Sequence, residues 1–148
     1  MAIKRYNPTS AGRRIMSVDA HEDITAQKPH RALIVARKKH GGRNNQGKIT
    51  VRHHGGGSRQ FTRLIDWKQN KFGVPATVAT IEYDPSRGAR VALVVYKDGE
   101  KRYMLLPDGV KVGQTIMSSD KKEGAEIAVG NRLPLEFLPI GTSVCNVE

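Results

Sequence analysis

The 148-residue sequence predicts an all-β protein organised around a small barrel. Short segments rich in β-branched and aromatic residues alternate with turns that contain Gly, Pro and Asp. No segment shows the apolar period of a long amphipathic helix. With 38% hydrophobic residues but only three Phe, one Trp and four Tyr, the core must consist mainly of Val, Ile and Leu. This length corresponds to one domain, with an arm or the start of a second unit.

Residues 1–58 are predicted to form an extended basic RNA-binding arm with glycine-rich loops. Residues 1–30 mix Gly, Pro, Ser, Thr and Asn with scattered charges and follow neither a helical nor a strand period. An apolar run at residues 32–35 precedes basic, glycine-rich loops on both sides of a short strand expected at residues 49–52. Arms of this composition usually become ordered on RNA.

Residues 59–130 are predicted to form the barrel. A first strand is expected at residues 59–66, where apolar and polar residues alternate only in part. A second is expected at residues 77–83, which are rich in β-branched side chains. The sequence Asp-Pro-Ser-Arg-Gly at residues 84–88 predicts a turn after it.

A β-hairpin follows this turn. Its strands are expected at residues 91–96 and 102–106, on either side of Asp98 and Gly99. An Asp-Gly pair suits a two-residue hairpin turn, which requires positive φ angles.

The last strands are short and separated by Gly and Pro. They are expected at residues 114–117, 126–129 and 142–147. Residues 131–148 are expected to form a linker and the first strand of a second unit.

Positive charge is concentrated in one half of the chain. The net charge is +11, and residues 1–72 contain 16 Lys and Arg against 4 Asp and Glu, whereas residues 73–148 contain 9 against 10. The first half therefore carries +12 and the second −1. Charge gathered in one contiguous half indicates a surface for phosphates rather than a general solubility device.

The same sequence argues against membrane, secreted and thiol-dependent classes. No apolar run approaches the roughly 20 residues that span a bilayer, and no apolar segment follows the charged N-terminus as in a secretory signal. The one cysteine, Cys145, fits a reducing compartment and an ordinary small apolar role. We therefore expect a cytoplasmic protein.

Residues 42–49 match most of the phosphate-binding loop pattern G-x-x-x-x-G-K-[ST]. The match fails at Ile49, where a hydroxyl must hold magnesium, and no helix pattern follows to offer its amides. The glycines have a simpler use, because they let the backbone approach a ribose-phosphate chain while Arg43 and Lys48 supply charge.

His53 and His54 invite a metal interpretation, but neighbours on an extended chain point to opposite faces and no further ligands complete a set. Beside residues 55–57, all glycine, they suit bases, sugars or phosphates instead. A basic run such as residues 37–39 is most often only solvated; among glycines, amides and histidines it favours RNA.

Three aromatic residues remain open between core packing and base stacking. Phe61 favours the core, Trp67 beside Lys68 favours a stacking or rim position, and Phe72 is undecided.

Several runs together resemble a known family. They are residues 41–53 (GGRNNQGKITVRH), 55–57 (GGG), 82–87 (EYDPSR), 96–103 (YKDGEKRY) and 139–148 (PIGTSVCNVE). The chain closely resembles the second protein of the bacterial large ribosomal subunit along nearly its whole length.

This resemblance implies an extended basic N-terminal arm, an oligonucleotide-binding-type five-stranded barrel, and the start of a second small Src-homology-type barrel. It also implies a structural protein without catalysis, cofactor or small-molecule substrate, which supports subunit assembly, subunit association and translation. The expected partners are large-subunit ribosomal RNA, neighbouring ribosomal proteins and, as a further option, the small subunit. The ribosome would be cytoplasmic, with an organellar one as the alternative. The family's basic tail has no counterpart here, so no role near peptidyl transfer is carried over.

The matched basic loop carries over a first set of expected RNA-binding residues: Arg43, Asn44, Asn45, Lys48, Arg52, His53, Arg59 and Arg63. Composition and position add a second set: Arg37, Lys38, Lys39, His40, His54, Lys68 and Lys71.

Two other functions compete with a structural ribosomal role. A free RNA chaperone would need surface aromatics on the barrel strands, for which Tyr83, Tyr96 and Tyr103 are the candidates. An enzyme of the nuclease or phosphate-loop type is the third alternative, and nucleotide hydrolysis would reveal it.

Overall fold

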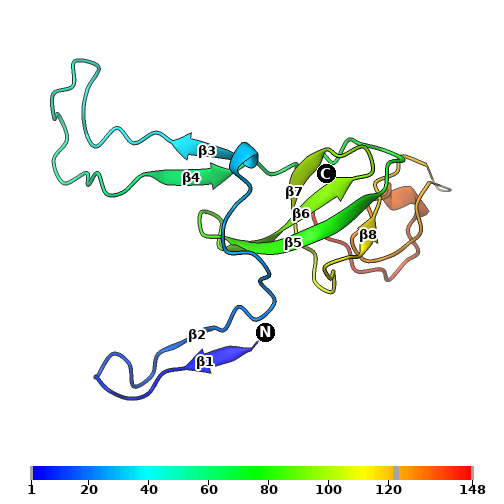
Figure 1. The fold of residues 1–148 in the computed structure, drawn as a ribbon, viewed down its shortest axis with the longest axis horizontal. Helices are drawn as coiled ribbons and strands as arrows, with labels where there is room; N and C mark the ends of the chain where they lie inside the picture. Colours follow the sequence, from blue (N-terminus) through cyan, green and yellow to red (C-terminus); the bar gives the residue numbers. More distant parts are fainter. Residues whose placement is uncertain (1, 122–123, 148) are drawn as a thin grey trace.

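The computed structural model describes residues 2–121 and 124–147, and it confirms the all-β prediction (Figure 1). The elements in chain order are β1 (Ile3–Arg5), β2 (Ser17–Asp19), η1 (Arg31–Leu33), β3 (Ile34–Arg37), β4 (Gln60–Arg63), β5 (Ala76–Asp84), β6 (Ala89–Tyr96), β7 (Lys101–Leu105), β8 (Thr115–Ile116) and η2 (Leu135–Phe137). Met1 and Glu148, the ends of the predicted first and last units, lie outside the described residues. Within these limits, no helix is both long and apolar enough to cross a membrane.

A curled antiparallel sheet in the order β7-β6-β5-β8 forms the body of the protein (Figure 1). The register between β5 and β6 shifts between Val78 and Thr80, and such a bulge bends a strand and increases its twist. Beside β7, Ile65 adds an isolated parallel bridge to Tyr103. The described sheet therefore has four strands, whereas five were expected.

Strand β6 is buried on both faces, which explains its nearly continuous apolar sequence. On one face Ala92 and Val94 join the larger core cluster. On the other face Val91, Leu93 and Tyr103 form a second cluster, against which Leu33 and Ile65 pack. Since Leu33 directly precedes β3 and Ile65 follows β4, this second cluster anchors the base of the β3-β4 ribbon.

The two predicted turns of the sheet are present, one with a different geometry. At the β5-β6 turn the side-chain Oδ1 of Asp84 accepts hydrogen bonds from the amide and hydroxyl of Ser86, at 3.0 and 2.8 Å. At the β6-β7 turn the Tyr96 amide donates to the Glu100 carbonyl, so the loop has three residues rather than two. Gly99, at φ 88°, takes the left-handed position that such loops require.

Three predicted strands are wrong. At residues 49–52 the Gly42 carbonyl accepts the amides of Thr50 and Val51, so the chain turns instead of extending. Residues 126–129 form an irregular loop that enters a turn only at Val129, and residues 142–147 run exposed outside any strand. In place of a last strand, η2 (Leu135–Phe137) is the final element. The strand expected at 114–117 is confirmed in its central pair, Thr115–Ile116.

The first 30 residues contain a hairpin where only an extended arm was expected. β1 and β2 pair in antiparallel register, with Lys4 opposite Val18. The following linker lies along β5, where the Thr25 amide donates to the Ile81 carbonyl at 3.0 Å and the Ile81 amide donates to Thr25 Oγ1 at 2.9 Å. The hairpin is thus attached to the sheet through this linker.

Candidate nucleic-acid interface

The most conspicuous basic feature is the loop of residues 38–59, which the β3-β4 ribbon carries away from the sheet (Figure 1). The ribbon pairs Ile34 with Arg63 at its base and Arg37 with Gln60 at its outer end. Its four backbone pairs fix where the loop leaves the body. We call residues 37–60 the basic finger.

A buried polar network joins the basic finger to the sheet. Arg63 Nε and Nη2 donate to Glu82 Oε2 at 3.1 and 3.0 Å, and the Tyr103 hydroxyl donates to the same carboxylate at 2.9 Å. The backbone amide of His30 donates to the Tyr103 hydroxyl at 2.7 Å. Burial, and to a lesser degree the Glu82 carboxylate, raise the pKa of the Tyr103 phenol. The network therefore stays protonated at Tyr103 and holds the ribbon base in one geometry.

The tip of the finger is folded by its own backbone. Asn44 Oδ1 accepts the amides of Gln46 and Lys48 at 3.1 and 2.9 Å, and the Asn44 amide donates to the Lys48 carbonyl. Gly42 has φ +70°, and a Cβ there would lie 2.1 Å from the Val51 carbonyl oxygen. Only glycine fits this close approach.

The finger surface carries positive charge and no negative charge. Residues 37–60 contain seven Lys and Arg and no Asp or Glu. The structure leaves these predicted residues exposed on the finger: Arg37, Lys38, Lys39, His40, Arg43, Asn44, Asn45, Lys48, Arg52, His53, His54 and Arg59. Lys39 also has a structural role, since its Nζ donates to the carbonyls of Gly56 and Ser58 at 2.8 and 3.0 Å. The structure thus brings twelve of the fifteen predicted residues together.

The other three predicted residues lie elsewhere. Arg63 is 7% exposed and committed to Glu82, so it does not face a ligand. Lys71 forms ion pairs with Asp98 and Glu100. The hydrogen bond to Asp98, followed by the one to Glu100, raises the pKa of its ammonium group. Lys68 is exposed in the loop after β4, away from the finger tip.

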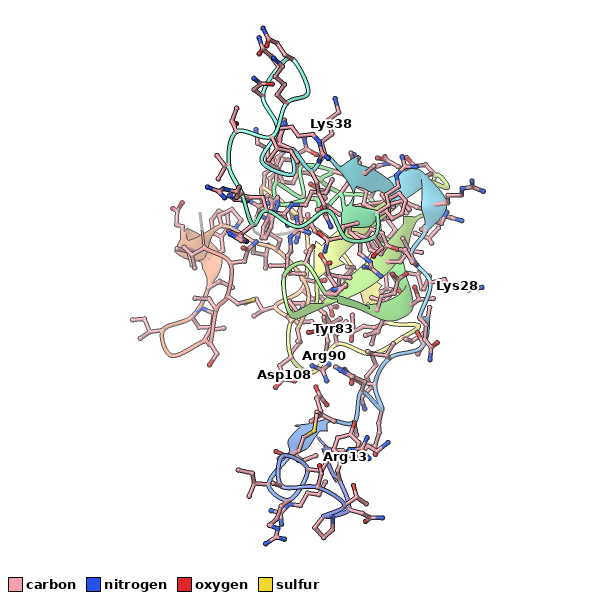
Figure 2. The ribbon with its side chains drawn as sticks, turned by 90° about the vertical axis from the view of Figure 1, so that its left-hand side faces the viewer. Arg13, Lys28, Lys38, Tyr83, Arg90 and Asp108 are labelled. Carbon is pink, nitrogen blue, oxygen red and sulfur yellow. The ribbon has the colours of Figure 1, made fainter. Side chains whose placement is uncertain are left out.

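Sequence reasoning did not single out the tip of the β1-β2 hairpin. The Arg13 guanidinium lies over the Tyr6 ring, 5.1 Å from its centroid, and Lys4 Nζ lies 5.5 Å from the same centroid. Arg14 and Arg5 add two exposed charges nearby. The Gly-Arg-Arg sequence at residues 12–14 was the available signal, because a glycine suits a turn and two arginines follow it directly. Figure 2 looks onto the face toward which both ribbons project, with Lys38 in its upper part and Arg13 in its lower part.

The finger does not resemble a nucleotide site. The amides of residues 44, 46, 47 and 48 are all used inside the loop, so they are not available to cradle a phosphate.

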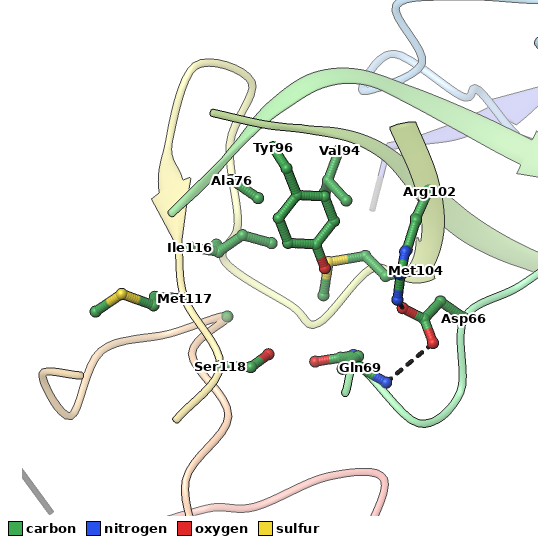
Figure 3. A pocket seen from close by; sticks show the side chains of 11 residues that line it. Asp66, Gln69, Ala76, Val94, Tyr96, Arg102, Met104, Ile116, Met117 and Ser118 are labelled. Atoms are coloured by element: carbon green, nitrogen blue, oxygen red, sulfur yellow. Dashed lines mark hydrogen bonds and ion pairs between the residues drawn. The ribbon is translucent and has the colours of Figure 1, made fainter. Parts of the chain in front are cut away.

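A separate small pocket in the sheet is lined by Asp66, Tyr96, Arg102 and Met104 among others, and its volume of about 10 Å³ admits roughly one water molecule (Figure 3). Among residues 2–121 and 124–147, no group of three or more His, Cys, Asp or Glu side chains could hold a metal ion.

What the arrangement can do is bind a polyanion with a preformed, acid-free surface. One comparison with known proteins identifies that polyanion. The family model described as "Ribosomal Proteins L2, RNA binding N-terminal domain" matches residues 30–118, more than half of the chain. The chain belongs to the ribosomal protein L2 family. The matched part begins at the base of β3 and ends just after β8, so it contains the whole basic finger and the whole sheet.

Membership of the L2 family makes this chain a ribosomal protein of the large subunit that binds ribosomal RNA. The L2 family is a family of structural RNA-binding proteins, in agreement with a surface built from charge and shape. The β1-β2 hairpin lies before the matched residues.

Proposed function

We propose that this protein is a structural constituent of the large ribosomal subunit, bacterial in type, that grips ribosomal RNA with the basic finger and the tip of the β1-β2 hairpin. The observation that carries this proposal is the acid-free, exposed surface of residues 37–60 on a ribbon anchored by Arg63 and Glu82. The twelve exposed finger residues are the proposed contacts, with Lys68 as an outlying one. Arg63 and Lys71 serve instead to hold the fold.

The same proposal covers assembly. A rigid body with two basic projections can fix two RNA segments relative to each other, which supports subunit assembly, subunit association and translation in a cytoplasmic ribosome. The curled sheet is proposed as the oligonucleotide-binding-type barrel, residues 59–130. Residues 1–58 are the arm and loops, and residues 131–148 lead into a second barrel. Neighbouring ribosomal proteins and the small subunit are further proposed partners.

The placement of the tyrosines favours this role over a free RNA chaperone. A chaperone that stacks bases on its barrel needs exposed aromatic rings on the strands. Tyr103 is fully buried and Tyr96 is 7% exposed, while the Tyr83 ring packs against His21 with centroids 4.8 Å apart. The described sheet therefore offers no row of exposed rings to RNA, and the exposed positive charge lies on the finger instead.

The salt dependence of RNA binding tests the proposal. Binding to a large-subunit ribosomal RNA fragment is measured between 50 and 200 mM salt, a range in which about 6 to 10 phosphate contacts change affinity strongly. A finger variant replaces four exposed residues with alanine: Lys38, Arg43, Lys48 and Arg52. A matched control removes the same charge from exposed positions on the sheet side: Lys97, Lys101, Lys111 and Lys121.

The finger variant should flatten the slope of log K against log[salt] by about three to four units, since each lost phosphate contact removes roughly one. The control should change the slope by less than about one unit. Equal slopes in the two variants would place the binding surface outside the finger. Co-sedimentation of the wild-type chain with large subunits on a sucrose gradient tests the assembly role.

A further inference from the structure

Phe61 is exposed, although its place in a strand favoured the core. It lies in β4, two residues after the last basic residue of the loop, and 47% of its surface is accessible. On the ribbon it faces Ala36, whose methyl group is too small to cover a phenyl ring. An exposed aromatic ring beside a positively charged surface indicates a site of interaction with a ligand.

The neighbours of Phe61 on its own face of the strand are both arginines. Within β4, residues 61 and 63 point to the same side, because side chains alternate along a strand, and Arg59 directly precedes the strand. Arg63 turns inward to Glu82, whereas exposed Arg59 places its guanidinium 5.3 Å from the centroid of the Phe61 ring. Of these two arginines, only Arg59 lies against the Phe61 ring, because Arg63 is held by Glu82.

We propose that Phe61 and Arg59 form a stacking site for one unpaired nucleobase of the bound ribosomal RNA. The inference rests on the proposed function and adds the chemical class of the contact. Bases inside a duplex already stack on each other, so an exposed ring gains most from a base that has left the helix. Arg59 is free to lie on the second face of that base, because a guanidinium plane stacks on bases as an aromatic ring does.

The backbone around Phe61 suits such a contact. Ala36 and Phe61 are paired within the ribbon, so the ring is held on a strand and not on the loop. The finger charges lie immediately beyond it, where they can bind the phosphates on either side of a splayed base. Phe61 thus supplies a contact to a nucleobase, whereas the rest of the finger surface contacts the sugar-phosphate backbone of the RNA.

Two other exposed aromatics lack this combination. Trp67 is 44% exposed, and Arg87 lies over it at 5.9 Å, but Arg87 is held by the Asp84 carboxylate at 2.7 Å and the Arg63 carbonyl at 3.2 Å. That guanidinium is not free to sandwich a base. Phe72 is 47% exposed like Phe61, yet it bridges to Ser118 on the far side of the sheet from the finger. Phe72 therefore serves as the matched control.

The test uses a large-subunit ribosomal RNA fragment in which single unpaired positions carry the fluorescent base 2-aminopurine. Its binding is compared for the wild-type chain and for the variants Phe61→Leu, Phe61→Tyr, Arg59→Lys and Phe72→Leu. In the wild type, one labelled position should change its fluorescence on binding. Phe61→Leu should abolish that change and weaken binding about 5- to 100-fold, the range for loss of one base stack, without altering the salt slope.

The remaining variants separate the contribution of the ring from that of the guanidinium group. Phe61→Tyr keeps an aromatic ring and should bind within about twofold of wild type. Arg59→Lys keeps the positive charge but loses the planar guanidinium group, so it should weaken binding, although less than Phe61→Leu does. If Phe61→Leu and Phe72→Leu bind with the same affinity and both show the same fluorescence change as the wild type, the stacking site is disproved. RNA binding through the finger is not affected by that outcome. Failure of the wild-type chain to bind the fragment would overturn both proposals.

Discussion

Arg63 on β4 and Glu82 on β5 form a buried ion pair in which two guanidinium nitrogens donate to a single carboxylate oxygen, at 3.1 and 3.0 Å. The pair joins the projecting ribbon to the sheet, and neither side chain is more than 8% exposed. The basic finger is therefore joined to the folded body by this ion pair together with the apolar cluster against which Leu33 and Ile65 pack.

Arg63→Ala should destabilise the protein strongly. Removing one partner leaves the Glu82 charge buried without compensation, which costs about 3 to 5 kcal/mol in comparable pairs. Urea unfolding followed by circular dichroism measures the change. Arg37→Ala, at the exposed outer end of the same ribbon, is the control and should change stability by less than about 0.5 kcal/mol. Similar losses in both variants would show that the ion pair is not the joint.

Gly42→Ala should damage the finger without damaging the sheet. The new Cβ would meet the Val51 carbonyl oxygen at 2.1 Å, so the loop must rearrange, and RNA affinity should fall roughly tenfold. Gly47, at φ +79°, has open space around it, so Gly47→Ala is strained without a clash and should have the smaller effect. Affinities that fall equally, or a lowered urea midpoint in Gly42→Ala, would contradict this prediction.

The docking of the β1-β2 hairpin should depend on pH. The Arg90 guanidinium on β6 donates hydrogen bonds to the carboxylates of Asp19 and Asp23. These bonds are the main reason why the pKa of both carboxyl groups lies below 3.8. A lowered pKa in the folded state means that the contact contributes above pH 3.8 and is lost as the pH falls through the lowered values.

Nuclear magnetic relaxation of the backbone amides of residues 3–19 measures this docking. The double variant Asp19→Asn, Asp23→Asn should show, at neutral pH, the increased hairpin motion that the wild type shows only in acid. Hairpin relaxation that is the same in the wild type and the double variant at neutral pH would mean that Arg90 does not hold the hairpin.

The near-match to a phosphate-binding loop should have no nucleotide activity. Since the amides of residues 44, 46, 47 and 48 are bonded within the turn, ATP and GTP binding should be undetectable by calorimetry, with or without magnesium. Lys48→Ala should weaken RNA binding only, by loss of one phosphate contact. Nucleotide binding that disappears in Lys48→Ala would refute this interpretation.

Features set by local chemistry could be predicted from the sequence, and features set by distant partners could not. The turn at residues 84–88 and the β6-β7 hairpin follow from Asp, Pro and Gly at turn positions. The burial of Arg63 depends on Glu82, 19 residues away in another strand, and nothing local announces that partner. The predicted strand at residues 49–52 failed for a related reason, because the Gly42 carbonyl captures its amides across the loop.

The candidate site shows the same division. Twelve exposed finger residues were predicted, because charge and glycine content are properties of the segment itself. The β1-β2 hairpin was not predicted, since Ile3, Lys4 and Arg5 are all exposed and a strand that buries nothing shows no alternating pattern. Phe61 was expected in the core, and the structure exposes it instead. The sequence does not reveal which residue lies opposite a strand position, and here that residue, Ala36, is too small to cover the ring.

The joint at Arg63 and Glu82 has a consequence for how this protein can evolve. Because the buried network ends there, the 22 residues between β3 and β4 add little to the free energy of folding. Insertions, deletions and substitutions in that loop should be tolerated by the sheet, since lengthening a loop costs little. The proposed recognition surface can therefore change with its RNA while selection for foldability acts on other residues. The sheet could also serve as a scaffold for a transplanted loop.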